Sequence, residues 1–164
     1  MIKFFVMDVD GTLTDGKIYM GEQGELMKAF NIKDGYAIKC ILPEHNIVPI
    51  IITARNSMIV KNRCDELDIK ECHLSISNKL DALKEIIDKY NNAEQTFFTL
   101  ANVLYVGDDI PDLQCMVKVK EAGGITACPA DAVQLILNTA TIVCKKNGGE
   151  GVVREITEHI IKDL

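Results

Sequence analysis

A repeated alternation of short apolar runs with amphipathic stretches is the feature that most constrains how this chain can fold. The apolar runs are rich in β-branched and aromatic residues, which is typical of strands buried on both faces of a parallel sheet. The clear runs are Lys3–Met7, Val48–Ile52, Val103–Val106 and Thr141–Cys144, and the weaker ones are Glu71–Leu74 and Gly124–Ala127.

The stretches between these runs have the periodicity of helices. Ser57–Leu67 and Lys79–Tyr90 carry apolar residues three and four positions apart, Pro111 is suited to open a helix, and Val152–Ile160 continues the pattern. Alternating strands and helices require right-handed crossovers, so the sequence predicts an α/β fold, Rossmann-like, with a mainly parallel sheet in three αβα layers. Ligands of such sheets bind beyond the carboxyl ends of the strands.

One segment departs from this rhythm. Lys17–Gly21 and Glu25–Asn31 flank Gln23 and Gly24, which predicts an antiparallel β-hairpin inserted directly after the first strand. No repeat, low-complexity tract or linker-like composition divides the 164 residues. We therefore expect a single domain over residues 1–164, with no room for a larger insertion.

Composition disfavours several classes of partner. A net charge of -6 argues against nucleic acid, because counterion release requires a face rich in lysine and arginine. The apolar run Phe4–Met7 is too short for a signal-peptide core or a membrane span. The six cysteines form no C-x-x-C pair and predict reduced thiols in the core. We expect a cytoplasmic protein with no nucleic-acid or membrane partner.

Two aspartates follow the first predicted strand. Asp8 and Asp10 are two positions apart, so in an extended chain their side chains point to the same side. Two like charges this close raise each other's pKa unless a cation neutralises them. Taken alone, the pair could merely begin a turn, as Asp and Gly often do after strands.

Polar residues also follow the second clear strand. Thr53 directly follows the run Val48–Ile52, and its hydroxyl can bind a phosphoryl oxygen. Lys79 begins a helix, where a cation opposes the helix dipole unless an anion such as phosphate lies nearby. Alone, each residue has a simpler interpretation, as a structural threonine and a solvated surface lysine.

Three more carboxylates follow the run Val103–Val106, namely Asp108, Asp109 and Asp112. Capping of the next helix accounts for one of them and not for three. Hard oxygen ligands of this kind suit magnesium. The combination predicts a magnesium-dependent site for a phosphate ester at one edge of the sheet.

These residues, in this order, resemble the haloacid dehalogenase (HAD) superfamily, whose four dispersed motifs match Asp8–Thr12, Thr53, Lys79 and Gly107–Asp112. Over essentially the whole chain the sequence is similar to the capless subgroup that includes the 3-deoxy-D-manno-octulosonate 8-phosphate (KDO-8-phosphate) phosphatases. The matching features are Thr14–Gly16, the hairpin, Arg55–Ser57, Arg63, Gly148–Gly151 and Arg154. The departures are Thr12, where the first motif more often has Val, and Ala54, where the subgroup has Gly.

The resemblance implies a HAD-type phosphatase, a phosphoric monoester hydrolase that uses Mg²⁺. Asp8 would be the nucleophile that forms an aspartyl-phosphate, and Asp10 would protonate the leaving hydroxyl and then activate water. Asp8, the backbone carbonyl of Asp10 and Asp108 would hold the metal.

The same resemblance gives roles to the flanking polar residues. Thr53 and Lys79 would bind the oxygens of the transferring group. Asp109 or Asp112 would orient Lys79 and the metal's waters, and Asp112 is the favoured partner of the lysine.

Three arginines have two interpretations. Single arginines most often pair with surface carboxylates, but Arg55, Arg63 and Arg154 match positions for which the resemblance implies capture of a substrate carboxylate. Arg55 is favoured because it closely follows Thr53. The implied substrate is a phosphorylated keto sugar acid, KDO-8-phosphate, as in lipopolysaccharide biosynthesis. The implied assembly is a homotetramer formed through the hairpin, and Gly148–Gly151 predict a flexible flap over the site.

Alternatives of other kinds remain open. One is a phosphatase for a nine-carbon, sialic-acid-type 9-phosphate, and Arg55 favours the eight-carbon acid over it. Another is a noncatalytic oligomerisation domain, against which the presence of Asp8, Asp10 and Lys79 argues. A third is a phospho-accepting receiver domain, which needs its phosphorylated aspartate on a central strand, whereas Val48–Ile52 is followed by Thr53.

Overall fold

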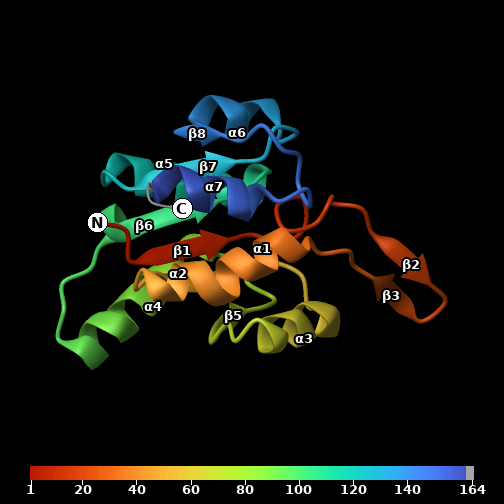
Figure 1. The fold of residues 1–164 in the computed structure, drawn as a ribbon, viewed down its shortest axis with the longest axis horizontal. Helices are drawn as coiled ribbons and strands as arrows, with labels where there is room; N and C mark the ends of the chain where they lie inside the picture. The colour runs from red at the N-terminus through yellow and green to blue at the C-terminus, as the bar shows by residue number, and fades with distance from the viewer. Residues whose placement is uncertain (162–164) are drawn as a thin grey trace.

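The computed structural model of the chain describes residues 1–161, so the last three residues of the predicted domain lie outside the described part. The helices and strands alternate along the chain much as the sequence predicts (Figure 1). In order they are β1 (Phe4–Met7), β2 (Tyr19–Gly21), β3 (Gly24–Met27), α1 (Ile32–Tyr36), a π-helical segment η1 (Ala37–Ile41), α2 (Leu42–Glu44), β4 (Val48–Ile52), α3 (Met58–Glu66), β5 (Glu71–His73), α4 (Lys79–Glu94), a 3-10 turn η2 (Leu100–Asn102), β6 (Val103–Val106), α5 (Ile110–Glu121), β7 (Ile125–Cys128), α6 (Gln134–Thr139), β8 (Ile142–Val143) and α7 (Val152–Ile160).

The main sheet has six strands in the order β5-β4-β1-β6-β7-β8, and every pair in it is parallel. β1 lies inside the sheet, where Phe4 is paired with Val48 of β4 on one side and with Val103 of β6 on the other. The sequence prediction of an α/β fold with a mainly parallel sheet is confirmed.

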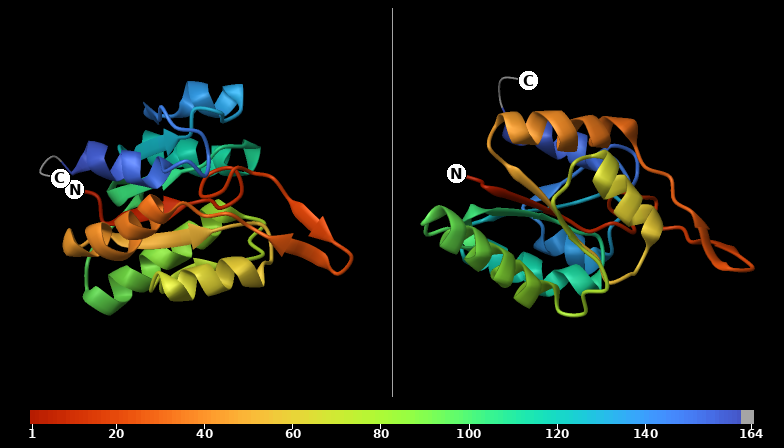
Figure 2. Two further views of the ribbon diagram at one scale, coloured as in Figure 1. Left: turned by 45° about the vertical axis from the view of Figure 1, so that its right-hand side comes forward. Right: turned by 90° about the horizontal axis from the view of Figure 1, so that it is seen from below.

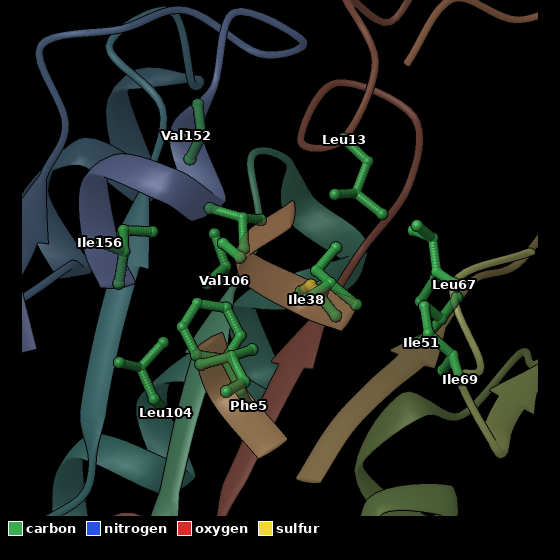
Figure 3. Packing of buried hydrophobic residues seen from close by; sticks show 14 of the residues in the cluster. Phe5, Leu13, Ile38, Ile51, Leu67, Ile69, Leu104, Val106, Val152 and Ile156 are labelled. Atoms are coloured by element: carbon green, nitrogen blue, oxygen red, sulfur yellow. The ribbon is translucent and has the colours of Figure 1, made fainter. Parts of the chain in front are cut away.

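Alternate residues of β1 point to opposite faces of the sheet, as the pleat requires. Phe5 and Met7 pack with residues of α1–α2, α3 and α7, and Figure 3 shows the part of this cluster around Phe5. Phe4 and Val6 pack on the other face with residues of α4, α5 and α6. Helices therefore cover both faces, and the strand is buried throughout, which explains its continuous apolar sequence.

Several boundaries differ from the sequence prediction. The last strand is only Ile142–Val143, and α4 continues past Tyr90 to Glu94, where Gln95 ends it in the left-handed conformation. The helices α1–α2 and α6 were not predicted. In the first of these, the helical hydrogen bonding shifts to the π type over Ala37–Ile41, which breaks the periodicity that the prediction relied on.

The hairpin β2–β3 is the insertion between β1 and α1, and in Figures 1 and 2 it projects away from the helices and the main sheet. Its strands are shorter than predicted. Met20, Leu26 and Met27 on it are at least half exposed. No cap domain is present among residues 1–161, as predicted.

The segment Gly148–Gly151 does not have the features of a free flap. Gly149 N–H donates to the carbonyl of Thr12 at 3.1 Å, and Gly148 N–H donates to Asp131 at 2.9 Å. A Cβ at Gly148 would lie 2.0 Å from the backbone oxygen of Gly11. The glycines allow two loops to pack backbone against backbone, so the prediction of a flexible flap is corrected.

Two other features agree with the composition. The six cysteines are free thiols, and four of them are buried. No helix within the described range 1–161 is both long enough and apolar enough to span a bilayer.

Candidate active site

The parallel register of β1, β4 and β6 brings the ends of these strands to one edge of the sheet. A pocket at this edge contains eight of the predicted site residues. They are Asp8, Asp10, Thr53, Arg55, Lys79, Asp108, Asp109 and Asp112. The residues come from strand ends and from the first turns of α4 and α5, so the topology of the sheet brings them together.

Lys79 lies at the centre of the buried side of this pocket. Its side chain is 4% exposed, and its ammonium donates to Asp8 Oδ1 at 2.8 Å and to Asp112 Oδ1 at 2.7 Å. Asn78 caps α4 and thereby fixes the residue that follows it. The lysine holds two carboxylates from different elements, Asp8 directly after β1 and Asp112 in the first turn of α5.

Asp112 has hydrogen bonds to both carboxylate oxygens. Besides Lys79, Oδ1 accepts from the hydroxyl of Tyr105 at 2.8 Å, and Oδ2 accepts from Asp108 N–H at 3.1 Å. A Cβ at Gly107 would lie 2.3 Å from Asp112 Cγ, so this carboxylate can approach the strand end only because residue 107 is glycine. Asp109 caps α5 and does not contact the lysine; Asp112 does, as the sequence analysis favoured.

Burial and mutual repulsion dominate the electrostatics of the pocket. Burial, and then the charge of Asp112, raise the pKa of Asp8 to about 6 although Lys79 opposes them. Burial, and then the charges of Asp8 and Asp112, raise the pKa of Asp108 to about 7. Burial would lower the pKa of Lys79, but its two aspartate partners outweigh this, and the pKa lies above its usual value. The cluster has more buried negative charge than its lysine neutralises.

Such a cluster could hold a hard divalent cation. Carboxylate oxygens of Asp8, Asp108 and Asp112 lie within 4.8 Å of one another. Asp112 already has hydrogen bonds to both of its oxygens, so Asp8 and Asp108 are the better donors. Thr12 donates to Asp108 Oδ1 at 3.2 Å and orients that carboxylate. An all-oxygen donor set with excess negative charge fits magnesium.

Three residues at the site were missed by the sequence analysis. The ammonium of Lys28 contacts Asp10, and it also forms an ion pair with Glu25 at 2.8 Å. Tyr105 was assigned only to a strand, although a buried tyrosine hydroxyl needs a partner and could have been noticed for that reason. Nothing in the sequence indicated that Lys28 and Glu25 of the hairpin lie at the site.

The three predicted arginines lie in different places. Arg55 lines the pocket, with Nε 3.8 Å from Asp10 Oδ2. Arg63 pairs with Glu66 at 2.8 Å, and Arg154 pairs with Glu158 at 2.6 Å. The structure therefore brings only Arg55 to the acidic cluster, and the predicted substrate contacts of Arg63 and Arg154 remain predictions.

This edge of the sheet, with its lysine-bridged aspartates and no cap over them, defines a phosphatase of the haloacid dehalogenase superfamily. Comparison with known proteins narrows the class. The chain is 41% identical over 160 residues to 3-deoxy-D-manno-octulosonate 8-phosphate phosphatase of Salmonella typhi, covering 98% of this chain and 79% of that protein. The Yersinia pestis protein is 37% identical over 98% of this chain and 80% of its own length.

Solved structures agree. A crystal structure of the Yersinia pestis phosphatase matches with a TM-score of 0.84 and 38% identity, over 97% of this chain and 80% of that one. The Moraxella catarrhalis phosphatase, in complex with magnesium, phosphate and KDO, matches with a TM-score of 0.87 and 34% identity, over 98% and 86%. No protein-family model matches the chain. The chain belongs to the family of 3-deoxy-D-manno-octulosonate 8-phosphate phosphatases.

Proposed function

We propose that this phosphatase hydrolyses KDO-8-phosphate with magnesium, through a phosphoryl group carried by Asp8. The observation that carries the proposal is Lys79, buried at the sheet edge and bonded to both Asp8 and Asp112. The support for the substrate is the relatives' activity and the Moraxella catarrhalis complex.

Asp8 is the nucleophile in this proposal. One carboxylate oxygen attacks phosphorus, an Asp8–phosphorus bond forms, and the bond from phosphorus to the sugar oxygen breaks. Lys79 and Thr53 bind phosphoryl oxygens, and Asp112 keeps the lysine directed at them. Magnesium, held by Asp8, Asp108 and the backbone carbonyl of Asp10, supplies positive charge that screens the phosphate from the carboxylates.

Asp10 transfers the protons. Its carboxyl group gives a proton to the leaving sugar oxygen as the ester bond breaks. In the second step the Asp10 carboxylate takes a proton from water, the resulting hydroxide bonds to phosphorus, and Asp8 is released with inorganic phosphate. The side chain is 18% exposed, which leaves it accessible to the water that the second step needs.

The remaining predictions belong to the same proposal. Arg55 binds the carboxylate of the sugar acid from the pocket rim, where its side chain is 46% exposed. The chain works as one domain in the cytoplasm and assembles as a homotetramer through the hairpin, whose exposed Met20 and Leu26 could pack against other copies.

A panel of phosphate esters tests the proposal. Phosphate release is measured with KDO-8-phosphate, a nine-carbon keto-acid 9-phosphate and hexose phosphates, with magnesium and with EDTA. We expect magnesium-dependent turnover, fastest with the eight-carbon acid. Faster turnover of the nine-carbon acid would change the proposed substrate but would leave the proposed phosphatase mechanism standing. Absence of turnover with every ester would favour the noncatalytic oligomerisation domain.

A further inference from the structure

The hairpin places a lysine against Asp10, a carboxylate that lines the pocket. Lys28 follows β3 directly, and its side chain is 1% exposed. Its ammonium contacts Asp10 Oδ1 and lies 2.8 Å from Glu25 Oε1, with which it forms an ion pair. We propose that Lys28 is a positioning residue for the proton transfers of Asp10, holding one carboxylate oxygen so that the other faces the substrate.

The other contacts of the pair fit this role. Glu25 also accepts a hydrogen bond from Ser57, the residue that caps α3, and lies 3.7 Å from Arg55 Nη2. Lys28 is therefore held by a carboxylate that is itself fixed to the body of the protein. A hairpin that served only for assembly would not need a desolvated lysine directed at the sheet edge, because burying an ammonium is costly unless it is paired.

The geometry distinguishes the two oxygens of Asp10. Oδ1 is in contact with Lys28, whereas among residues 1–161 the ion pair of Oδ2 is a long one, 3.8 Å to Arg55. Oδ2 is thus the oxygen left to exchange protons with the leaving group and with water. This inference rests on the proposed function, in which Asp10 is the acid and then the base. Without Lys28, the carboxylate can rotate, and the well-oriented fraction falls.

The experiment compares leaving groups. A sugar alkoxide needs a proton from Asp10 to leave, but p-nitrophenolate leaves without one. In Lys28→Met, we expect the first-turnover release of the sugar to fall about 10- to 100-fold, while first-turnover release of p-nitrophenol stays within about threefold of wild type. Steady-state hydrolysis of both esters falls, since the water step uses Asp10 in each case.

Matched variants separate this role from folding and assembly. Lys17→Met removes a lysine whose side chain is 72% exposed and which precedes the same hairpin, and it should leave both first-turnover rates unchanged. Lys28→Arg, which keeps the charge, should restore most of the sugar release. Thermal unfolding and light scattering check that the variants remain folded and keep the wild-type oligomeric state. If Lys28→Met does not fold, Lys28→Gln takes its place.

The outcomes are distinct. An equal fall in both first-turnover rates, or no change in either, would overturn the positioning role while wild-type turnover still supports the phosphatase. A wild-type protein that releases neither product would overturn the proposed function and this inference together.

Discussion

Lys79 and Lys28 are both buried lysines that hold an aspartate of the pocket, but different parts of the fold provide them. Lys79 is the first residue of α4 and bonds two carboxylates, one directly after β1 and one in the first turn of α5. Lys28 arrives on an inserted hairpin and bonds Asp10 together with a hairpin carboxylate. The sheet and its helices alone therefore hold the carboxylates on one side of the pocket, whereas on the other side an insertion holds Asp10, which is called the hairpin side below.

The difference assigns different tasks to the two sides. The sheet side holds the groups proposed to attack phosphorus and to bind its oxygens, and these groups are rigid because they lie at element ends. The hairpin side holds the proposed proton carrier and Arg55, which face the part of the substrate that leaves. Changes on the sheet side should affect every ester, whereas changes on the hairpin side should depend on the leaving group.

The largest expected effect is on the sheet side. Asp8→Asn should lower turnover of all esters by at least about 10⁴-fold, because no carboxylate remains to attack phosphorus. The same variant should resist unfolding better than wild type without magnesium, since one buried charge is removed from a mutually repelling cluster. Steady-state rates and urea unfolding check both results. Asp65→Asn, at a carboxylate that is 61% exposed on α3, is the control.

Lys79→Met should combine loss of activity with loss of stability. The variant leaves Asp8 and Asp112 buried without their cation, and breaking a buried pair costs on the order of 3 to 5 kcal/mol. Urea unfolding measures the loss in the free energy of unfolding. Lys118→Met, at a half-exposed lysine of α5, is the control. A loss no larger than that of the control would show that the buried lysine contributes little to the sheet side.

Asp34 is a buried carboxylate that, among the described residues, forms no ion pair with a lysine, unlike Asp8 and Asp10. It therefore shows what burial without such a pair does to an aspartate. It is 2% exposed, and its Oδ2 has no hydrogen-bond partner among the described residues. Burial raises its pKa from the ordinary 3.8 to about 6, although the N–H of Arg154 opposes the shift.

The folded state therefore keeps the proton of Asp34 while the unfolded state loses it. The contribution of Asp34 to stability should fall by on the order of 3 kcal/mol as the pH rises from about 4 to about 6, and stay level above. Asp34→Asn should lack this contribution, so the difference in unfolding free energy between variant and wild type changes over that range. A difference independent of pH would contradict the prediction.

The smallest expected effect is on the hairpin side. Arg55→Ala should raise KM for keto-acid phosphates about 10- to 100-fold, the loss of one charged hydrogen-bonding group. KM for p-nitrophenyl phosphate, which has no carboxylate, should stay nearly unchanged. Equal increases for both esters would mean that Arg55 acts on phosphate and not on the sugar acid.

The residues on the sheet side could be predicted because each directly follows a predicted strand or begins a predicted helix. A carboxylate after an apolar run, such as Asp8 or Asp108, must lie at the edge where parallel strands end. The contacts on the hairpin side depend on the path of the chain after β1. The periodicity of the sequence does not predict that Lys28 lies against Asp10. The packing of Gly148 against Gly11 was also not predictable, since glycine in a loop indicates either mobility or close approach.

The position of β1 inside the sheet has a consequence for how the protein is made. β1 is synthesised well before its partners β4 and β6. Pairings so distant in sequence form slowly, and until then an apolar strand has two open edges and is prone to aggregate. Asp8, the proposed nucleophile at its end, gains the neighbouring Asp108 and Asp112 only when β6 has docked, so catalytic competence should appear late in folding.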